Sequence, residues 1–282
     1  MFKGAKAVFL GTLLATGSLY AFEEAPWFGN LWEFKADFDY QFSHYSEIEG
    51  SINTGKKSSN DSLVTLGLGA YFGSVLSDEI QPSWNGQLEL EIAKTTDRDL
   101  NARSLGLMVR KLLLDDIAGD AVSLDIGVSV RYVPKSTLND PSNPYHGSGN
   151  FELSVAVGKE ISRGNEWLIH PYALTAFGFS GRKSCWNRTD LVARINCSET
   201  FDLELAAKGY FGLGGGAAVN LATFDGWSGI KHRSIDLALT GSYKVPYAGS
   251  INLGVSRRIY AVSYPDNAYA VNLSYTLPFS PF

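Results

Sequence analysis

WEFKADFDYQFS, the stretch from residue 32 to residue 43, alternates strictly between two kinds of side chain. Every second residue, starting at Trp32, is aromatic or alanine, and every residue between them is polar or charged. Successive side chains of a β-strand point to opposite faces, whereas an α-helix would mix the two sets. The stretch therefore predicts a β-strand with one apolar face and one charged face.

The same period of two returns along the chain and predicts twelve antiparallel strands. The alternation is blurred in 167–179, and it is shortest near 219–221, within a segment 216–224 on which the even count depends. The apolar positions of the predicted strands lie within 32–42, 64–72, 84–92, 105–109, 122–132, 151–157, 167–179, 201–207, 219–221, 235–239, 251–255 and 269–277.

The connections between these strands alternate between long and short. The odd connections are mostly long or polar and lie at 46–60, 95–100, 134–148, 181–199, 225–232 and 262–266. The even connections are tight turns at 77–79, 115–119, 162–165, 212–216 and 246–249. This asymmetry is typical of a membrane β-barrel with short periplasmic turns and longer outer loops.

The beginning of the chain predicts a signal peptide over 1–21. Lys3 and Lys6 precede an uncharged apolar run, 7–19, which is too short to span a membrane as a helix, and Ala21 offers a small residue for cleavage. The alternative is a permanent N-terminal anchor. We expect a periplasmic segment at 22–30 and a barrel over 31–282. The formal net charge of −5 makes nucleic acid an unsuitable partner.

Alternation alone does not say which face is wet, because a soluble periplasmic β-protein also alternates. Charges along the strand middles favour lipid outside, since a filled soluble core would not accept them. Aromatic residues also gather at the strand ends, as interfacial girdles do. The girdle residues would be Trp32, Trp84 and Trp167 at one rim, and Tyr45, Tyr132, Phe179, Tyr260 and Tyr269 at the other.

The last strand ends in the aromatic and apolar series Tyr275, Leu277, Phe279, with Phe282 at the terminus. With this ending, the whole pattern resembles the outer-membrane β-barrel superfamily, whose assembly machinery recognises a final strand ending in Phe. The resemblance implies an all-β, transmembrane, up-and-down barrel in the cell outer membrane, with lipid and the barrel-assembly machinery as partners. Pro278 and the out-of-phase Phe282 depart from the pattern, so the signal would end at Phe279.

If the apolar set faces lipid, the charged set faces the lumen, where acidic residues outnumber basic ones and would favour cations. We predict a porin-like channel for ions or small solutes; the alternative is a closed structural or adhesion barrel that exposes its outer loops. The predicted pore-lining residues are Glu33, Lys35, Asp37, Asp39, Glu89, Glu91, Asp125, Arg131, Glu152, Asp202, Glu204, Lys208, Asp236, Lys244 and Arg258. Oligomeric state stays open.

Two His-x-Ser pairs, His44 with Ser46 and His146 with Ser148, raise a further alternative. Residues two apart on a strand project from one face, so a histidine could serve as base for a serine nucleophile in an outer-membrane lipid hydrolase. The second pair is similar to the His-x-Ser-Asn-Gly element of outer-membrane phospholipase A, with the last two residues reversed. Such pairs arise easily by chance, and we expect no enzymatic activity.

Cys185 and Cys197 are the only cysteines, and both fall in the predicted loop 181–199. An oxidising envelope would let them form a disulfide; the alternative is two free thiols. No histidine or second cysteine pair accompanies them at zinc spacing, so we expect no metal site and no cofactor.

Overall fold

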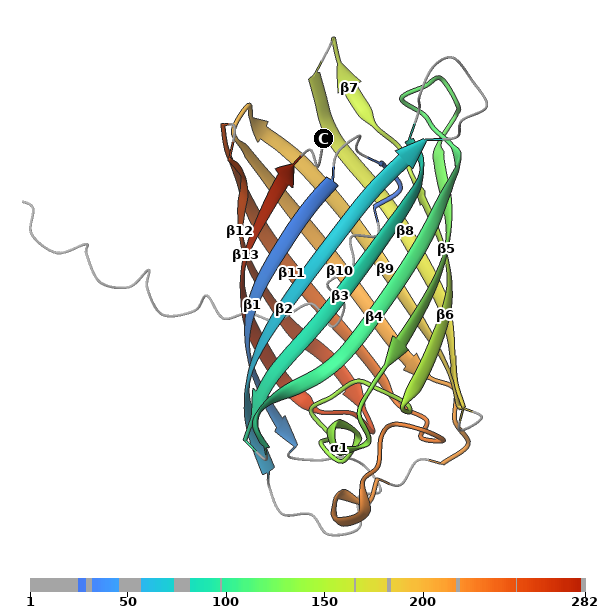
Figure 1. The fold of residues 1–282 in the computed structure, drawn as a ribbon, viewed down its shortest axis with the longest axis vertical. Coiled ribbons are helices and arrows are strands. Elements are labelled where there is room, and N and C mark those ends of the chain that lie inside the picture. Colours follow the sequence, from blue (N-terminus) through green and yellow to red (C-terminus); the bar gives the residue numbers. More distant parts are fainter. Residues whose placement is uncertain are drawn as a thin grey trace, which may run out of the picture.

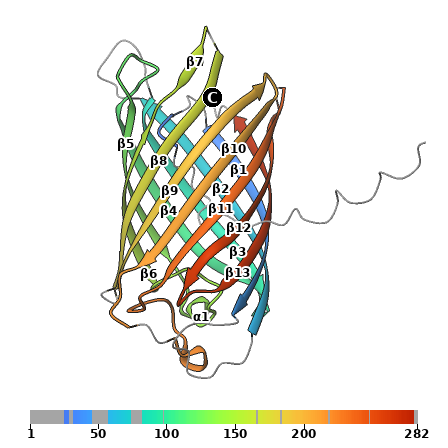
Figure 2. The same ribbon diagram turned by 180° about the vertical axis from the view of Figure 1, so that it is seen from behind.

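The computed structural model describes residues 25–28, 32–45, 57–73, 82–96, 98–164, 166–181, 184–216, 219–246 and 248–279. Their strands form one closed antiparallel barrel, seen from opposite sides in Figures 1 and 2. The strands are β1 (Trp32–Tyr45), β2 (Lys57–Gly73), β3 (Pro82–Thr95), β4 (Arg98–Leu114), β5 (Ser123–Tyr132), β6 (Gly149–Gly158), β7 (Ile161–Arg163), β8 (Glu166–Ser180), β9 (Ser184–Ser198), β10 (Phe201–Gly212), β11 (Arg233–Val245), β12 (Gly249–Val262) and β13 (Asp266–Phe279).

Twelve of these strands close the barrel. β1 pairs with β13, from Trp32 opposite Phe279 onward, and so joins the two ends of the sheet. β6 pairs directly with β8, which leaves the short β7 as an extension beyond the rim beside β8. Within the described ranges, the helical elements are one turn each, α1 (Lys135–Leu138) and η1 (Leu221–Thr223). Among the described residues, no helix is long and apolar enough to cross a membrane.

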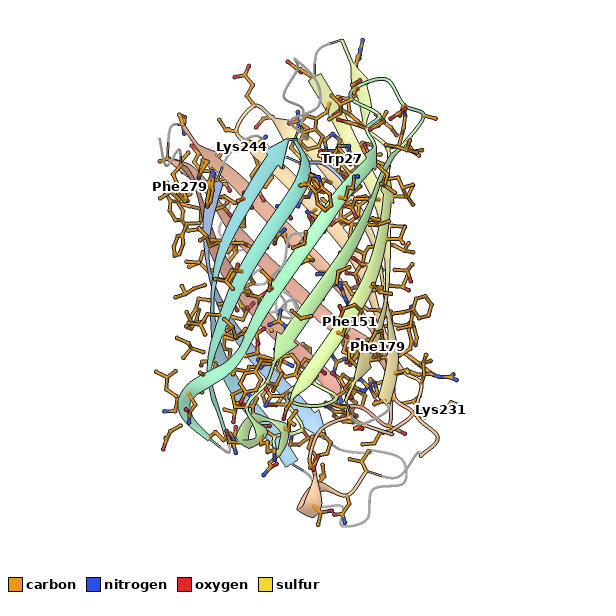
Figure 3. All side chains as sticks on the ribbon, turned by 45° about the vertical axis from the view of Figure 1, so that its right-hand side comes forward. Trp27, Phe151, Phe179, Lys231, Lys244 and Phe279 are labelled. Atoms are coloured by element: carbon orange, nitrogen blue, oxygen red, sulfur yellow. The ribbon has the colours of Figure 1, made fainter. Side chains whose placement is uncertain are left out.

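The apolar face of each strand points outward. On β1, Phe38 is 47% exposed, whereas its neighbours Asp37 and Asp39 are 4% and 3% exposed. Such a surface is unfavourable in water and suits the hydrocarbon of a bilayer. Aromatic pairs lie toward both rims: Phe151 and Phe179 have ring centroids 4.6 Å apart near one rim, and Phe279 lies near the other, as Figure 3 shows.

The two ends of the barrel differ in their connections. At one end, which we call the turn end, short segments such as 199–200 and 246–248 join the strands. At the other end, the loop end, the segments 133–148 and 213–232 are long, and α1 marks this end in Figure 1. The two longest described connections lie at the loop end, as predicted. The full alternation is wrong, because only two or three residues join β3 to β4, β8 to β9 and β12 to β13 at the loop end, whereas eight join β4 to β5 at the turn end, where β1 begins and β13 ends.

Two of the predicted strands and loops are wrong. The segment 184–198, predicted as a loop, is β9, and the segment 216–224, predicted as the weakest strand, lies in the loop after β10 and contains η1. Since one strand was missed and one was invented, the count of twelve remains correct. β9 lacks an apolar outward face near its start, because Asn187 and Thr189 point outward and hydrogen-bond to each other at 3.1 Å.

Candidate functional site: the barrel lumen

A polar cavity of about 680 Å³ occupies the turn-end half of the lumen. The cavity begins at the turn end, where Glu33, Ser250 and Pro278 lie near the ends of their strands. It reaches inward as far as mid-strand residues such as Asn272. Most of its wall comes from the inward faces of β1 and β8–β13, with Trp27 added from the N-terminal segment. Its small polar side chains, Ser242, Ser250, Asn252, Ser274 and Thr276, leave space that larger residues would fill.

Five acidic and five basic residues line the cavity, so its wall carries no net formal charge. The acidic residues are Glu33, Asp37, Asp190, Asp202 and Glu204, and the basic ones are Lys35, Arg188, Arg194, Lys208 and Lys244. Most form ion pairs along the wall: Arg194 with Glu204 at 2.7 Å, Lys244 with Asp202 at 2.8 Å, Arg188 with Asp190 at 3.1 Å, and Lys35 with Asp37 at 3.2 Å. The predicted excess of acidic charge is absent from this cavity.

A second group of charged residues lies in the opposite wall, on β3, β4 and β5, where they are buried and paired. Arg131 contacts Glu89 at 2.9 Å and Glu91 at 3.2 Å, and Arg110 contacts Asp125 at 2.9 Å. All five side chains are 7% exposed or less. Each arginine thus compensates carboxylates that would otherwise be strongly destabilising in the interior.

An N-terminal segment, Ala25–Phe28, lies inside the barrel beside the cavity. The guanidinium of Arg110 donates a hydrogen bond to the carbonyl of Ala25 at 2.8 Å and lies over the ring of Phe28, 4.8 Å from its centroid. The indole of Trp27 donates to Asp116 at 3.1 Å and stacks on His170 at 4.5 Å. These contacts narrow the turn-end mouth of the lumen.

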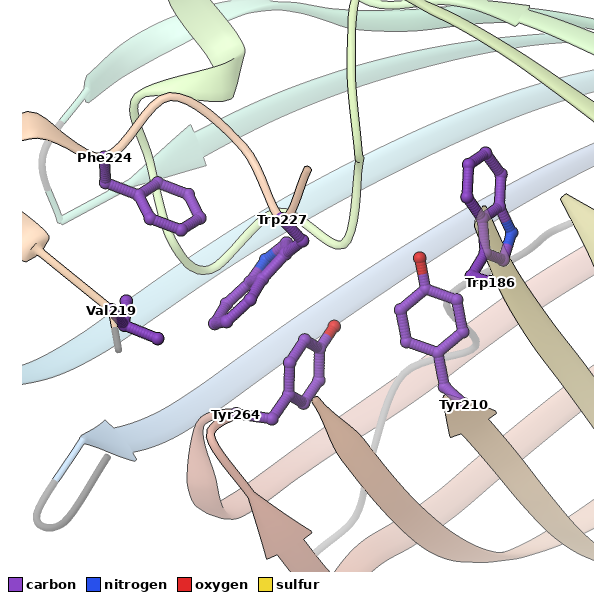
Figure 4. Close-up of a cluster of buried hydrophobic side chains, with 6 residues drawn as sticks. All are labelled: Trp186, Tyr210, Val219, Phe224, Trp227 and Tyr264. Carbon is purple, nitrogen blue, oxygen red and sulfur yellow. The ribbon is translucent and has the colours of Figure 1, made fainter. Parts of the chain in front are cut away.

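The loop end of the lumen is filled by residues 133–148 and the described part of 213–232, which together we call the plug. Side chains of the plug and of the barrel together form a buried cluster, shown in Figure 4. Its six members are Val219, Phe224 and Trp227 from the plug, and Trp186, Tyr210 and Tyr264 from the barrel. The rings of Phe224 and Trp227 lie 5.0 Å apart, and Trp227 lies 4.6 Å from Tyr264. The cluster therefore spans from the loop to the barrel wall.

Hydrogen bonds fasten the plug to itself and to the barrel. The Trp227 indole donates to the carbonyl of Asn143 at 2.7 Å, and the Tyr210 hydroxyl donates to the carbonyl of Pro144 at 2.7 Å. The Tyr145 hydroxyl donates to the carboxylate of Glu91, deep in the charged wall. Burial is the largest cause that raises the pKa of Tyr145, so this hydroxyl keeps its proton.

No family model matches this chain, and no curated protein matches it in sequence. Solved structures do match. An outer membrane channel from Pseudomonas putida F1 has a TM-score of 0.57 at 12% identity, with 88% of this chain and 96% of that chain covered. The NanC porin has a TM-score of 0.54 at 8% identity, with 88% of this chain and 100% of the porin chain covered. The chain has the fold of an outer-membrane β-barrel. The translocator domain of the autotransporter NalP from Neisseria meningitidis is similar too, with a TM-score of 0.50, 12% identity and 89% of each chain covered.

All fifteen predicted pore-lining residues belong to the inward set of the barrel. Seven of them line the cavity: Glu33, Lys35, Asp37, Asp202, Glu204, Lys208 and Lys244. The other eight are buried in ion-paired or hydrogen-bonded contacts: Asp39, Glu89, Glu91, Asp125, Arg131, Glu152, Asp236 and Arg258.

The predicted disulfide is wrong. Cys185 and Cys197 are free and exposed, and they lie near opposite ends of β9. Twelve residues of extended strand separate them by roughly 40 Å at about 3.3 Å per residue. A disulfide requires Cα atoms within about 7 Å, so the two thiols cannot meet within one chain.

The His-x-Ser pairs have different outcomes. Ser46 and the side chain of His44 lie outside the described residues, as do the expected signal peptide and Phe282. His146 does not contact Ser148 as the motif would require; its Nδ1 lies 2.7 Å from the hydroxyl of Ser184 on β9.

Sequence reasoning missed the contact between His146 and Ser184, and also the cavity residues Arg188 and Arg194, because it placed 181–199 in a loop. A loop of that length was itself a signal, since unstructured connections so long are uncommon.

Proposed function

We propose that this protein is a porin-like channel of the outer membrane for ions or small polar solutes, with its loop end outside and its turn end in the periplasm. The observation that carries the proposal is the polar cavity of about 680 Å³, which reaches the turn end and has charged walls. A barrel built only as a scaffold gains nothing from a wet, charged interior space. The plug closes the other end, so the structure corresponds to a closed channel.

The cavity lining also suggests how selective the channel is. Because five acidic and five basic side chains line it, the wall favours neither ion class strongly. We therefore propose weak ion selectivity in place of the cation preference expected from the sequence. Polar or zwitterionic solutes suit such a wall, because each paired group can exchange its partner for a group of the solute.

Conductance of the refolded barrel in a planar lipid bilayer tests this proposal. We expect discrete current steps that are rare for the closed form and frequent when the plug is weakened. In a salt gradient, the reversal potential should lie close to zero. Correct insertion must be checked independently, by the resistance of the folded barrel to protease. A barrel that is inserted but passes no current, even with the plug weakened, would favour the closed structural or adhesion role.

Lipid hydrolysis is not the activity we propose. His146 and Ser184 are 0% and 2% exposed, so a lipid ester cannot reach their contact in this conformation. An assay on phospholipid vesicles would decide the matter. Product release that is lost in Ser184→Ala, Ser148→Ala or Ser46→Ala would overturn the non-enzymatic assignment.

A further inference from the structure

Two buried histidines join the two loops of the plug. His146 belongs to the segment 133–148 and His232 ends the segment 213–232, and their Nε2 atoms lie 3.3 Å apart. Both side chains are 0% exposed. Among the described residues, His232 Nδ1 is a buried nitrogen with no hydrogen-bond partner. This pair joins the two loops directly, beside the hydrogen bonds that Trp227 donates to the carbonyls of Asn143 and Tyr145.

Aromatic rings surround both imidazoles. His146 stacks on Trp186 at 4.3 Å and meets the edge of Tyr210 at 5.9 Å, and its Nδ1 contacts Ser184. His232 stacks on Tyr264 at 4.8 Å, with Tyr210 at 4.9 Å and Trp227 at 5.3 Å. Gly212 packs so closely that a side chain there would meet the His232 ring, at 2.4 Å from Cδ2. Both imidazoles are therefore shielded from bulk solvent.

The charged groups near the pair cannot compensate a new positive charge. Besides His146 itself, Arg258 on β12 acts electrostatically on His232, and it is a cation. The neighbouring carboxylates are already engaged: Arg258 holds Asp236 at 2.7 Å, and Glu152 accepts the Trp186 indole at 2.6 Å and contacts Arg188. Among the described residues, no carboxylate is an electrostatic partner of either imidazole.

Proton count decides whether the contact can persist. Two neutral imidazoles share one hydrogen between their Nε2 atoms, one donating and the other accepting. A first added proton places an uncompensated cation in a dry aromatic site beside Arg258, which is costly. A second added proton sets two N–H donors against each other.

We propose that His146 and His232 form an acid-sensitive latch, which holds the two loops over the lumen at neutral pH and releases them on acidification. The proposal that acid releases the loops is argued from the histidine pair alone. The further proposal that the opened loop end passes solute also depends on the proposed channel function.

The direction of the effect follows from linkage. Burial lowers the pKa of His146 to about 3 and lowers that of His232 as well, whereas released, hydrated loops would restore values near 6.5. The closed form is thus fully favoured above about pH 6.5 and loses stability as the pH falls toward 3. Each pH unit in that window shifts the ratio of released to closed loops up to about tenfold for each histidine.

Hydrogen exchange on the full barrel in lipid at pH 7.5 and pH 4.5, corrected for intrinsic exchange rates, tests loop release. We expect peptides from 133–148 and 213–232 to lose protection at least tenfold at pH 4.5, while the strands keep theirs. His146→Asn with His232→Phe keeps an amide for Ser184 and a ring for Tyr264 but removes both titrations, so its loops should stay protected. His44→Gln removes a histidine elsewhere and should leave the acid response intact.

A second measurement is needed if the loops of the double variant fail to close over the lumen at neutral pH. Imidazole titration of the unaltered protein by NMR should show two histidines that stay neutral until the loops open. Loops that stay protected at pH 4.5, or His146 and His232 titrating near 6.5 under intact loops, would overturn the latch. Loops that open without any current at pH 4.5 would support the latch and overturn the channel function instead.

Discussion

The two halves of the lumen are built from the same alternating strands, yet one is filled and the other is hollow. In the loop-end half, the inward residues Trp186 and Tyr210 are large, and the plug adds further rings. In the turn-end half, the inward residues include three serines, two asparagines and ion pairs, around a cavity of about 680 Å³. The difference shows that strand number alone does not decide whether a barrel of this size is open. The size of the inward side chains and the path of the loops decide it.

The largest effect should come from Arg131→Ala in the filled half. This change leaves Glu89 buried without its cation and leaves Glu91 with only the more distant Arg103, at 3.9 Å, so we expect the free energy of unfolding to fall by about 3–5 kcal/mol. Unfolding in urea from lipid vesicles, followed by tryptophan fluorescence, measures it. A loss below about 1 kcal/mol would mean that water reaches these carboxylates and that this half is not dry.

Trp227→Ala should weaken the plug without unfolding the barrel. The residue is 0% exposed and makes its contacts to Phe224, Tyr264 and the carbonyl of Asn143, so its loss should cost loop closure about 3–5 kcal/mol. We expect frequent channel openings at neutral pH in a planar bilayer. Trp84→Ala, on the outer surface beside Lys111, serves as the matched control and should leave the current unchanged. Equal currents in both variants would show that the plug does not close the lumen.

The sequence predicted the hollow barrel better than the filled end. Period-two alternation identified the outward face and assigned all fifteen charged residues to the inside, because each strand follows one local rule. The plug follows no local rule: Val219 and Leu221 look like a strand and instead belong to a loop that packs on the distant Tyr264. His146 was noticed for a serine two residues away, yet its contacts, Ser184 and His232, lie far along the chain. Tertiary contacts of loops are the part that sequence patterns do not contain.

Lys208→Glu should change ion selectivity in the hollow half. The substitution turns a neutral cavity wall into one with a net charge of −2, since Lys208 is one of five basic residues opposite five acidic ones. A net wall charge of −2 attracts a passing monovalent cation about 7 Å away by roughly 1 kcal/mol in water and repels an anion by as much. We therefore expect the cation-to-anion permeability ratio to rise several-fold. The reversal potential in a salt gradient measures it, and Lys208→Gln should give about half the shift in millivolts. An unchanged potential would mean that ions do not pass along this wall.

The smallest effect should come from Lys244→Ala, and it is the sharpest test of the contrast between the two halves. Lys244 contacts Asp202 at 2.8 Å, much as Arg131 contacts Glu89 at 2.9 Å, so the distances alone predict similar losses. The surroundings differ, because the Lys244 side chain is 43% exposed and the Arg131 side chain 7%. In a wet cavity the pair should contribute less than about 1 kcal/mol and should weaken further as salt is added. If Lys244→Ala destabilised the barrel as much as Arg131→Ala, the cavity would be dry, and the space between these strands would not conduct.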